Sequence, residues 1–465
     1  MFGRTTNRHG RQAYPWERRR RRILIFFVAI PLLLLGAFAG WRVYLQRGVA
    51  QRLEVIRAQG FPASLEELEA WYPPIPEEEN AWKWYRQAFD AWSNPSPEQL
   101  EPLLPRNLEP PKRTEAFPDE ALAAMRGYAA MNAETLELLH RAAAMPHCRY
   151  PIDLSEGQAI DLPHLSAIDK IELLLRFEVE IALDAGDTGR VLRALSDIVV
   201  LGCSLRDEPV PRSQWKRMGL NATACSSLER VLSRTALPAE AALALGGVLA
   251  SAESPEAGLR AALGEFCAGI PRFSIPVADR VNYRLLFTKF RRVADEFVPC
   301  VLDAAGGGCV DLQYYLDAHF PILQAARLPR PEGLSAERSC GPMLESIPYR
   351  WAPRSYALRW QVGGTINLIA RDEAQLRTAR TALAVERYRL AYGGLPGMLD
   401  ALIPEFLDVV PADPYNGEPL RYHILDAGYV VYSVSSNLSD EGGDERENNA
   451  GELYSSDAIF KVERL

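Results

Sequence analysis

The most regular pattern in the chain is an uncharged apolar run from Ile23 to Trp41. Its nineteen residues are enough for a helix to cross the hydrocarbon core of a bilayer. Eight arginines and one glutamate precede it in residues 1–22, and basic residues on this flank predict a cytoplasmic N-terminus and an exported body. We therefore expect a basic cytoplasmic tail at 1–22 and a transmembrane anchor at 23–41. A cleaved signal peptide is the alternative, because Ala37-Phe38-Ala39 fits a cleavage site.

Helical periodicity dominates residues 45–265, which form most of an exported α-helical domain expected at 45–370. Apolar residues recur three or four positions apart, the spacing that places them on one helix face. The segments expected to be helical run from 76 to 92, 168 to 187, 188 to 205, 213 to 233 and 238 to 251. Short turns between such segments predict a bundle of helical hairpins or an irregular solenoid. Residues 270–370 are rich in proline, arginine and aromatic residues, and we expect them to be irregular.

The pattern changes near residue 371. A helix is expected from about Asp372 to Tyr392, followed by a second short helix near Pro396. Alternation at residues 420–424 and 429–433 predicts a β-hairpin, and residues 459–462 add a third strand. The fold class expected for the whole chain is mainly α, ending in a small α+β module at 371–465.

Charge is divided unevenly along the chain. The 465 residues carry a net charge of -8, but residues 1–22 carry +7, so the remaining 443 carry -15. Such an acidic body leaves little room for the basic face that phosphate binding requires. The charge pattern therefore argues against a nucleic-acid partner, and the expected partner is the membrane, through the apolar helix at 23–41.

The seven cysteines form no C-x-x-C pair of the kind that binds a metal. They are Cys148, Cys203, Cys225, Cys267, Cys300, Cys309 and Cys340. Cys300 and Cys309 flank a glycine-rich turn, where a disulfide is one alternative in an exported domain. Cys203 and Cys225 lie in helical patterns, where buried free thiols are favoured.

Catalytic motifs are missing from the sequence. There is no G-x-S-x-G, no H-E-x-x-H and no glycine-rich phosphate loop with a lysine. We expect His140 and His147 to be structural, and carboxylates such as Glu178, Glu180 and Glu265 to lie on solvated helix faces. An envelope hydrolase whose carboxylates are assembled only by folding stays open as an alternative function.

Aromatic residues gather near the start of the helical region. They are Trp71, Tyr72, Trp82, Trp84, Tyr85, Phe89 and Trp92. A stacking platform for sugars or peptides is one interpretation of such a cluster. Their helical spacing favours core packing instead.

An acidic loop joins the predicted hairpin to the last strand. From Ser435 to Asp457 it holds seven carboxylates against one arginine. The carboxylates are Asp440, Glu441, Asp444, Glu445, Glu447, Glu452 and Asp457. Oxygen ligands around Gly442-Gly443 suit a hard cation with flexible coordination, although the spacing is not that of an EF-hand. From these residues alone, a cation site and a solvated acidic loop are both open.

The C-terminal residues resemble the C-terminal half of the major pseudopilin of type II secretion. The matching positions are Gly394-Leu395-Pro396, Leu399, Leu402, residues 411–422, Tyr432-Ser433 and residues 440–444. In that family the loop after the hairpin binds calcium through carboxylates and backbone carbonyls. The resemblance implies that Asp440, Asp444 and Asp457 are side-chain ligands. It also implies that Ser435 and Leu438 offer carbonyl oxygens.

The N-terminal run departs from that family, because it has no Gly-Phe processing site and no early glutamate, so assembly into a pseudopilus is not expected. The whole chain more closely resembles a group of membrane-anchored proteins of planctomycetes and related bacteria. The shared features are the anchor, G-x-P-x-x-L-x-x-L at 60–68, E-E-N at 78–80, an A-x-x-G-D-like helix end at 182–187 and the tail. We therefore expect a single-pass inner-membrane protein whose extracytoplasmic body is a scaffold or interaction protein contacting an envelope or secretion assembly.

Overall fold

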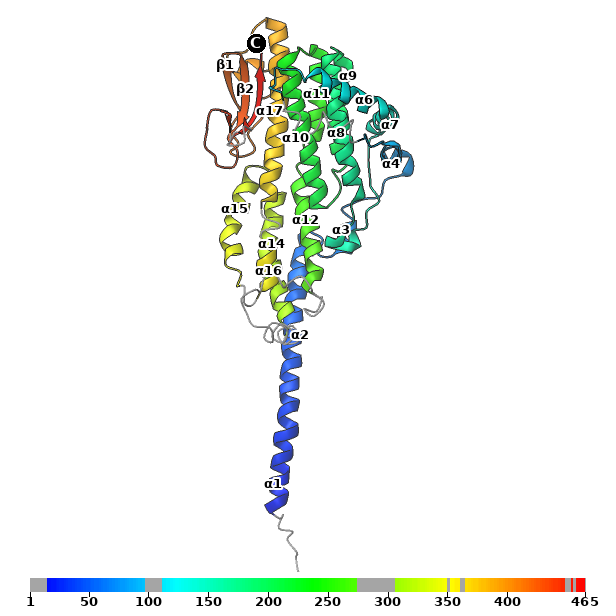
Figure 1. The fold of residues 1–465 in the computed structure, drawn as a ribbon. Helices are drawn as coiled ribbons and strands as arrows, with labels where there is room; N and C mark the ends of the chain where they lie inside the picture. Colours follow the sequence, from blue (N-terminus) through cyan, green and yellow to red (C-terminus); the bar gives the residue numbers. More distant parts are fainter. Residues whose placement is uncertain are drawn as a thin grey trace, which may run out of the picture.

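The computed structural model describes residues 15–96, 111–273, 306–348, 352–359, 364–447, 453–454 and 457–464. Its ribbon shows a helical body carried on one long helix, with a small sheet against the body at the end remote from that helix's start (Figure 1). Cys300 lies outside the described residues, and the disulfide considered between Cys300 and Cys309 therefore does too.

The long helix, which we call the stem, consists of three segments that follow one another without a break. They are α1 (Pro15–Leu24), the π turn η1 (Ile25–Ala29) and α2 (Ile30–Ala58). The stem is long and apolar enough to cross a membrane between Arg22 and Ala58, and its most apolar part is not buried in the body. Leu45 and Ile56 are only 3% and 2% exposed, because the far end of α2 enters the body. The predicted apolar helix is confirmed, and it continues directly into the core.

The body is helical along most of its described length. Its α-helices are α3 (Leu65–Glu69), α4 (Trp82–Ala91), α6 (Asp119–Met131), α7 (Ala133–Ala143), α8 (Pro163–Asp184), α9 (Thr188–Cys203), α10 (Pro211–Arg234), α11 (Ala239–Ala252), α12 (Ala257–Gly269), α14 (Gly307–Arg327), α15 (Glu332–Glu345), α16 (Pro353–Leu358) and α17 (Thr365–Tyr392). Short 3₁₀ segments accompany them, namely η2 (Glu77–Glu79), η4 (Leu154–Ala159), η5 (Ile270–Phe273) and η8 (Leu399–Leu402). The prediction of a mainly α-helical chain is confirmed.

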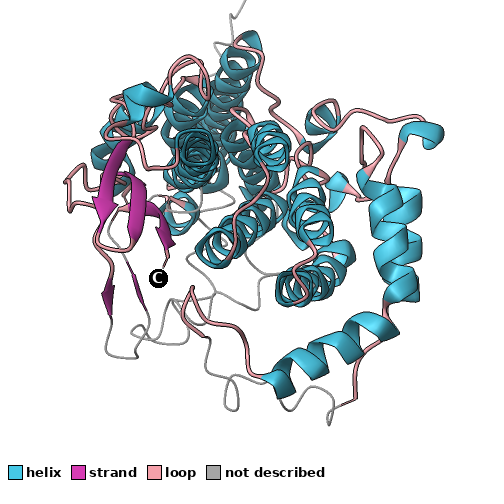
Figure 2. Ribbon diagram, turned by 90° about the horizontal axis from the view of Figure 1, so that it is seen from above, coloured by secondary structure: helices cyan, strands magenta, loops and turns pink. Residues whose placement is uncertain are grey.

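The helices α8, α9, α10, α11 and α17 form the part of the body next to the sheet. α9 contacts α8, α10 and α11, and α17 contacts α10 and α11. Figure 2 shows helices of the body end-on and close together, with the sheet standing at one side. Ile171, Leu175 and Leu195 are at most 1% exposed, because the apolar stripes of neighbouring helices face one another.

The expectation that residues 270–370 are irregular is wrong for their described part. This part forms η5, α14, α15, α16 and the start of α17. Pro321 and Pro342 lie inside α14 and α15, although proline usually breaks a helix. Tyr315, Ile322 and Leu323 on α14 are almost completely buried, so tertiary packing stabilises a helix that the local sequence disfavours.

Two predicted helix starts are displaced in the structure. Residues 77–79 form the turn η2, and the helix expected from Pro76 begins only at Trp82, as α4. The side chain of Asn80 explains the delay, because its Oδ1 accepts hydrogen bonds from the backbone N–H of Trp82 at 3.1 Å and of Arg149 at 2.9 Å. Near Pro396, the expected short helix is the 3₁₀ segment η8.

The predicted hairpin and third strand are confirmed. β1 (Arg421–Leu425), β2 (Gly428–Ser433) and β5 (Ala458–Glu463) form an antiparallel sheet in the order β1-β2-β5. Two short strands follow β2 and precede β5 along the chain. They are β3 (Arg446–Glu447) and β4 (Leu453–Tyr454), and they pair with each other in a separate sheet. β5 packs against α10 and α17, and β2 packs against α17.

The helix α17 joins the sheet to the rest of the body. It begins at Thr365, earlier than the Asp372 expected from the sequence, and ends where Gly393 adopts a left-handed conformation with φ of 75°. Leu376 and Val385 are buried in the same core as Ile171 of α8 and Val431 of β2. Residues 371–465 therefore share a hydrophobic core with the preceding helices.

The aromatic cluster packs in the core, as the helical spacing predicted. Tyr72 and Tyr85 are 1% and 2% exposed, and the Trp82 and Tyr150 rings lie 5.3 Å apart between centroids. Cys225 is a buried free thiol as expected, whereas the free thiol Cys203 is half-buried.

A buried ion pair fixes α10 against α17. The Arg217 guanidinium donates to Asp372 Oδ2 at 3.0 Å, and both side chains are at most 2% exposed. Asn221 donates to the other carboxylate oxygen at 2.9 Å, and Arg217 also donates to the Ala252 carbonyl at 3.0 Å. Each charge is thereby hydrogen-bonded, which is the condition under which a buried ion pair is tolerated.

We predict that Asp372→Ala lowers the free energy of unfolding by about 3–5 kcal/mol, because the Arg217 guanidinium would stay buried without its carboxylate. Denaturant unfolding of the full chain in detergent measures this change. The control is Arg126→Ala, which removes an exposed ion pair with Asp184 and should cost at most about 1 kcal/mol. Equal costs for the two variants would contradict the prediction.

Candidate functional site

The acidic loop leaves β2 through an unusual backbone conformation. Ser435 and Leu438 both have φ of 57°, a left-handed value that residues other than glycine seldom adopt. Ser435 accepts a hydrogen bond at its carbonyl from the Leu438 N–H at 3.3 Å. These two residues are the ones for which the resemblance implied carbonyl ligands. Strained backbone of this kind is often retained where a site requires it.

Asp440 is held by three groups on one side of the loop. Its Oδ2 accepts from Arg421 Nε at 2.9 Å, and its Oδ1 accepts from the Tyr432 hydroxyl and the Gly442 N–H, both at 3.0 Å. These donors lower the pKa of Asp440 although partial burial opposes them. The carboxylate is therefore already paired with an arginine.

Asp457 and Glu441 bring two carboxyl groups together. Asp457 is 4% exposed, and its Oδ2 accepts from the Gly443 N–H at 2.9 Å. Burial, and then the Glu441 and Asp440 carboxyls, raise the pKa of Asp457 to about 6. Two carboxylates brought together repel each other, and a shared proton or a bound cation relieves the repulsion.

The expected ligand set is only partly assembled. Asp440 and Asp457 act on each other electrostatically, but the Asp444 side chain is exposed to solvent. Among the described residues, no three His, Cys, Asp or Glu side chains gather closely enough to hold a metal ion. Glu441 lies beside Asp457 and was not among the expected ligands, although its place in the acidic run made it a candidate. Residues 448–452 of the loop lie outside the described residues.

The part of the loop at Glu445 is attached to α10 through charged groups. Glu445 accepts from both terminal nitrogens of Arg113, and from Lys461 Nζ at 3.3 Å. Glu229 on α10 accepts from the Lys461 backbone N–H at 2.7 Å and lies 3.4 Å from Arg113 Nε. Burial is the main cause that raises the pKa of Glu229 to about 7, while Arg113 opposes the increase.

We predict that Glu229 makes stability depend on pH. Its pKa of about 7 in the folded chain exceeds the ordinary value of 4.5, so the folded state holds the proton more tightly. The stabilisation is complete below pH 4.5 and is lost as the pH rises through 7. The melting temperature of the wild type minus that of Glu229→Gln should therefore fall between about pH 5 and pH 8.

The control for this measurement is Glu256→Gln, which changes an exposed carboxylate at the start of α12. Its difference from the wild type is the baseline against which the change for Glu229→Gln is measured. A constant difference for Glu229→Gln over the same pH range would show that Glu229 does not titrate as proposed.

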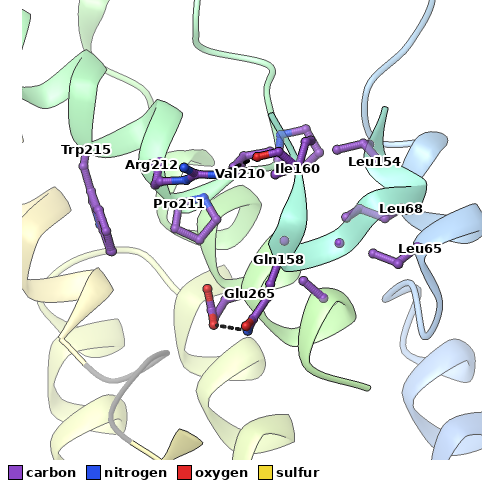
Figure 3. Close-up of a pocket in the computed structure, with 14 residues that line it drawn as sticks. Leu65, Leu68, Leu154, Gln158, Ile160, Val210, Pro211, Arg212, Trp215 and Glu265 are labelled. Atoms are coloured by element: carbon purple, nitrogen blue, oxygen red, sulfur yellow. Dashed lines mark hydrogen bonds between the residues drawn. The ribbon is translucent and has the colours of Figure 1, made fainter. Parts of the chain in front are cut away.

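A hollow of about 200 Å³ opens on another side of the body, between α3, η4, α10 and α12. Its walls are largely apolar, as Figure 3 shows. They are formed by Leu65, Leu68, Leu154, Gly157, Gln158, Ile160, Pro209, Val210, Pro211, Arg212, Trp215, Gly264, Glu265 and Ala268. The close approach of α12 to the chain at Pro209 depends on Gly264, since a Cβ there would lie 1.8 Å from the Pro209 oxygen.

Glu265 is the carboxylate among the residues that line this hollow. Its Oε1 accepts from the Gln158 amide at 3.1 Å, and burial raises its pKa. The expectation of a solvated helix face for Glu265 is therefore wrong, because η4 folds over α12. Glu178 and Glu180 were also expected in solvent, but both are 7% exposed. Arginines of neighbouring helices cover them, because Arg190 of α9 donates to Glu178, and Arg230 and Arg234 of α10 donate to Glu180.

Two histidines make contacts between elements of the body. His140 Nδ1 on α7 lies 2.5 Å from Asp197 Oδ2 on α9, and this carboxylate raises the pKa of His140. His164 is buried, with Nε2 3.2 Å from Glu208 and its ring stacked on Tyr150 at 4.3 Å. These contacts join neighbouring elements, in agreement with the structural role expected for His140.

Comparison with known proteins finds no matching family model, no matching curated protein and no matching solved structure.

Proposed function

We propose that this chain is a membrane-anchored extracytoplasmic scaffold or interaction protein. The observation that carries the proposal is the unbroken stem, which leads from an exposed apolar span into the core at Leu45 and Ile56. A helix rises about 1.5 Å per residue, so Leu45 lies about 6 Å beyond Trp41 along the stem. The body would therefore be held close to the membrane surface by a rigid connection.

The basic tail supports an orientation for this anchor. Eight arginines precede the apolar span, and basic residues favour the cytoplasmic side. We propose a single-pass inner-membrane protein with a cytoplasmic N-terminus and an extracytoplasmic body. An envelope or secretion assembly is the kind of partner that the C-terminal resemblance suggests.

If the anchor is retained, the mature protein purified from membranes should begin near Met1. Intact mass and N-terminal sequencing measure this directly. Ala39→Leu, which removes the small residue required at a cleavage site, should leave the N-terminus unchanged. A wild-type N-terminus at Gly40 that disappears in Ala39→Leu would instead demonstrate a cleaved signal peptide.

We further propose that the acidic loop binds one structural calcium ion. Three features support a hard cation with oxygen ligands: the left-handed conformations of Ser435 and Leu438, the paired carboxyls of Asp457 and Glu441, and flexible glycines beside them. Ser435 and Leu438 would supply carbonyl oxygens, and Asp440, Asp444 and Asp457 carboxylates. Asp440 would have to turn from Arg421, and Asp444 would have to turn inward. Calcium fits better than magnesium, because it tolerates irregular cages of several carboxylates.

The calcium proposal predicts that EGTA lowers the melting temperature of the full chain in detergent by about 2–5 °C when calcium was present well above its Kd. Asp440→Ala combined with Asp444→Ala should abolish this difference. The matched control is Asp426→Ala, an exposed acid in the turn between β1 and β2, which should preserve it. A melting temperature that EGTA does not change in the wild type would contradict calcium binding.

The geometry of the hollow favours an interaction protein over the hydrolase alternative. Glycoside hydrolysis, for example, uses two carboxylates roughly 5–10 Å apart. The residues that line the hollow include Glu265 as their one carboxylate, and their other polar groups belong to Gln158, Arg212 and Trp215. This set can accept and donate hydrogen bonds, but it does not supply an acid and a base together.

A further inference from the structure

We propose that the hollow between η4, α10 and α12 is the anchor site for an aromatic side chain with one hydrogen-bond donor, a tyrosine or tryptophan, of a partner protein. This inference rests on the proposed function as an interaction protein. Tyrosine and tryptophan anchors that fill a pocket contribute much of the binding energy at many protein interfaces.

The size of the hollow fits one aromatic ring. Its volume is about 200 Å³, and an engineered cavity of about 150 Å³ is sufficient to hold benzene. Leu65, Leu154, Ile160 and Val210 supply apolar walls. These side chains come from different elements of the body, so the folded chain brings them together. Burial of a ring against such walls is the main source of affinity.

An acceptor is placed where the donor of the ring would reach. Glu265 Oε1 is used by Gln158 at 3.1 Å. The other carboxylate oxygen points away from Gln158 toward Pro211, as Figure 3 shows. A phenol O–H or an indole N–H entering between the walls could donate to this oxygen. An apolar ring without a donor would leave a partly buried carboxylate unsatisfied.

The rim of the hollow also favours an aromatic ring. Trp215 is 46% exposed, and Figure 3 shows its indole on the opposite side of the hollow from Leu65 and Leu68. Arg212 donates to the Ile160 carbonyl at 2.7 Å, which holds its guanidinium at the rim. Stacking on an indole and contact with a guanidinium both stabilise an aromatic ring.

A lysine or arginine is a poorer occupant on the same evidence. Arg212 lines the hollow, and the charge of Arg272 acts on Glu265 and lowers its pKa against the effect of burial. A cationic side chain entering the hollow would meet both positive groups. The neutral donor of a phenol or an indole meets neither repulsion, and therefore fits the charge of the site better.

The test uses three fluorinated probes with the full chain in lipid nanodiscs. They are 4-fluorophenol, which carries a donor, fluorobenzene, which lacks one, and 4-fluorobenzylamine, which is cationic at neutral pH. Fluorine NMR line broadening measures the affinity of each probe, after subtraction of the signal from empty nanodiscs. We expect 4-fluorophenol to bind about fivefold or more tightly than fluorobenzene, because only the phenol satisfies Glu265.

Variants assign this binding to the hollow. Glu265→Gln should weaken 4-fluorophenol about fivefold and fluorobenzene little, and Trp215→Ala should weaken both rings about threefold or more. Glu256→Gln and Tyr314→Ala are the matched controls, because they change an exposed carboxylate on the same helix and an exposed aromatic ring elsewhere. They should leave both affinities unchanged. The exposure of Trp215 makes its removal compatible with folding.

Two sets of results would overturn the proposal. Tighter binding of 4-fluorobenzylamine than of 4-fluorophenol would define a site for cations. Equal binding of 4-fluorophenol and fluorobenzene, or affinities that the Glu265 and Trp215 variants do not change, would show that the hollow is not a specific aromatic site. The position of the mature N-terminus tests the membrane anchor separately, so failure of one proposal is distinguishable from failure of the other.

Discussion

The burial of α17 is the constraint on which the rest of the structure depends. Its first half, with Ile366, Ala370 and Ala374, lies in the core next to the stem, and its second half, from Leu376 to Val385, lies in the core next to the sheet. Alanines along the helix allow neighbouring elements to approach closely. Because one rigid helix passes through both cores, the position of the stem and the position of the C-terminal sheet are fixed relative to each other.

Charged side chains on this buried helix determine its rotation. Asp372 pairs with Arg217 of α10, Glu373 lies 3.0 Å from Arg330, and Glu386 lies 2.7 Å from Arg464 after β5. A buried carboxylate without a partner is costly, so a rotated or shifted α17 would leave several charges uncompensated at once. The apolar residues make the helix a core element, and these pairs select one arrangement of it.

The two candidate sites, the acidic loop and the hollow, lie at different places around this core. The acidic loop extends from the sheet that α17 supports, and Glu445 and Glu229 attach it to α10 through Arg113 and Lys461. The hollow lies on the outside of α12, where η4 and the start of α10 cover part of the helix. A stem that enters the core holds both sites at set heights above the proposed membrane surface, an arrangement suited to presenting binding surfaces.

The sequence by itself determined the features that follow from local periodicity. The uncharged run predicted the apolar helix, the spacing of leucines and isoleucines predicted the helices near α8 and α9, and alternation predicted the strands of the sheet. These patterns are readable because the repeat of the side chains matches the repeat of the backbone. The acidic loop was likewise visible as a run of carboxylates, whereas the left-handed conformations of Ser435 and Leu438 are known only from the structure.

Tertiary structure decided the features that depend on distant partners. Pro321 and Pro342 argued against helices that packing nevertheless stabilises. Glu265 was expected to be an ordinary surface acid. In the structure η4, which lies more than a hundred positions earlier in the chain, covers it, and the Gln158 amide donates a hydrogen bond to its carboxylate. The direction in which Asp440 points depends on Arg421 and Tyr432, which come from neighbouring strands. Such choices rest on the free energy of contacts between segments far apart in the chain, and no local pattern contains that information.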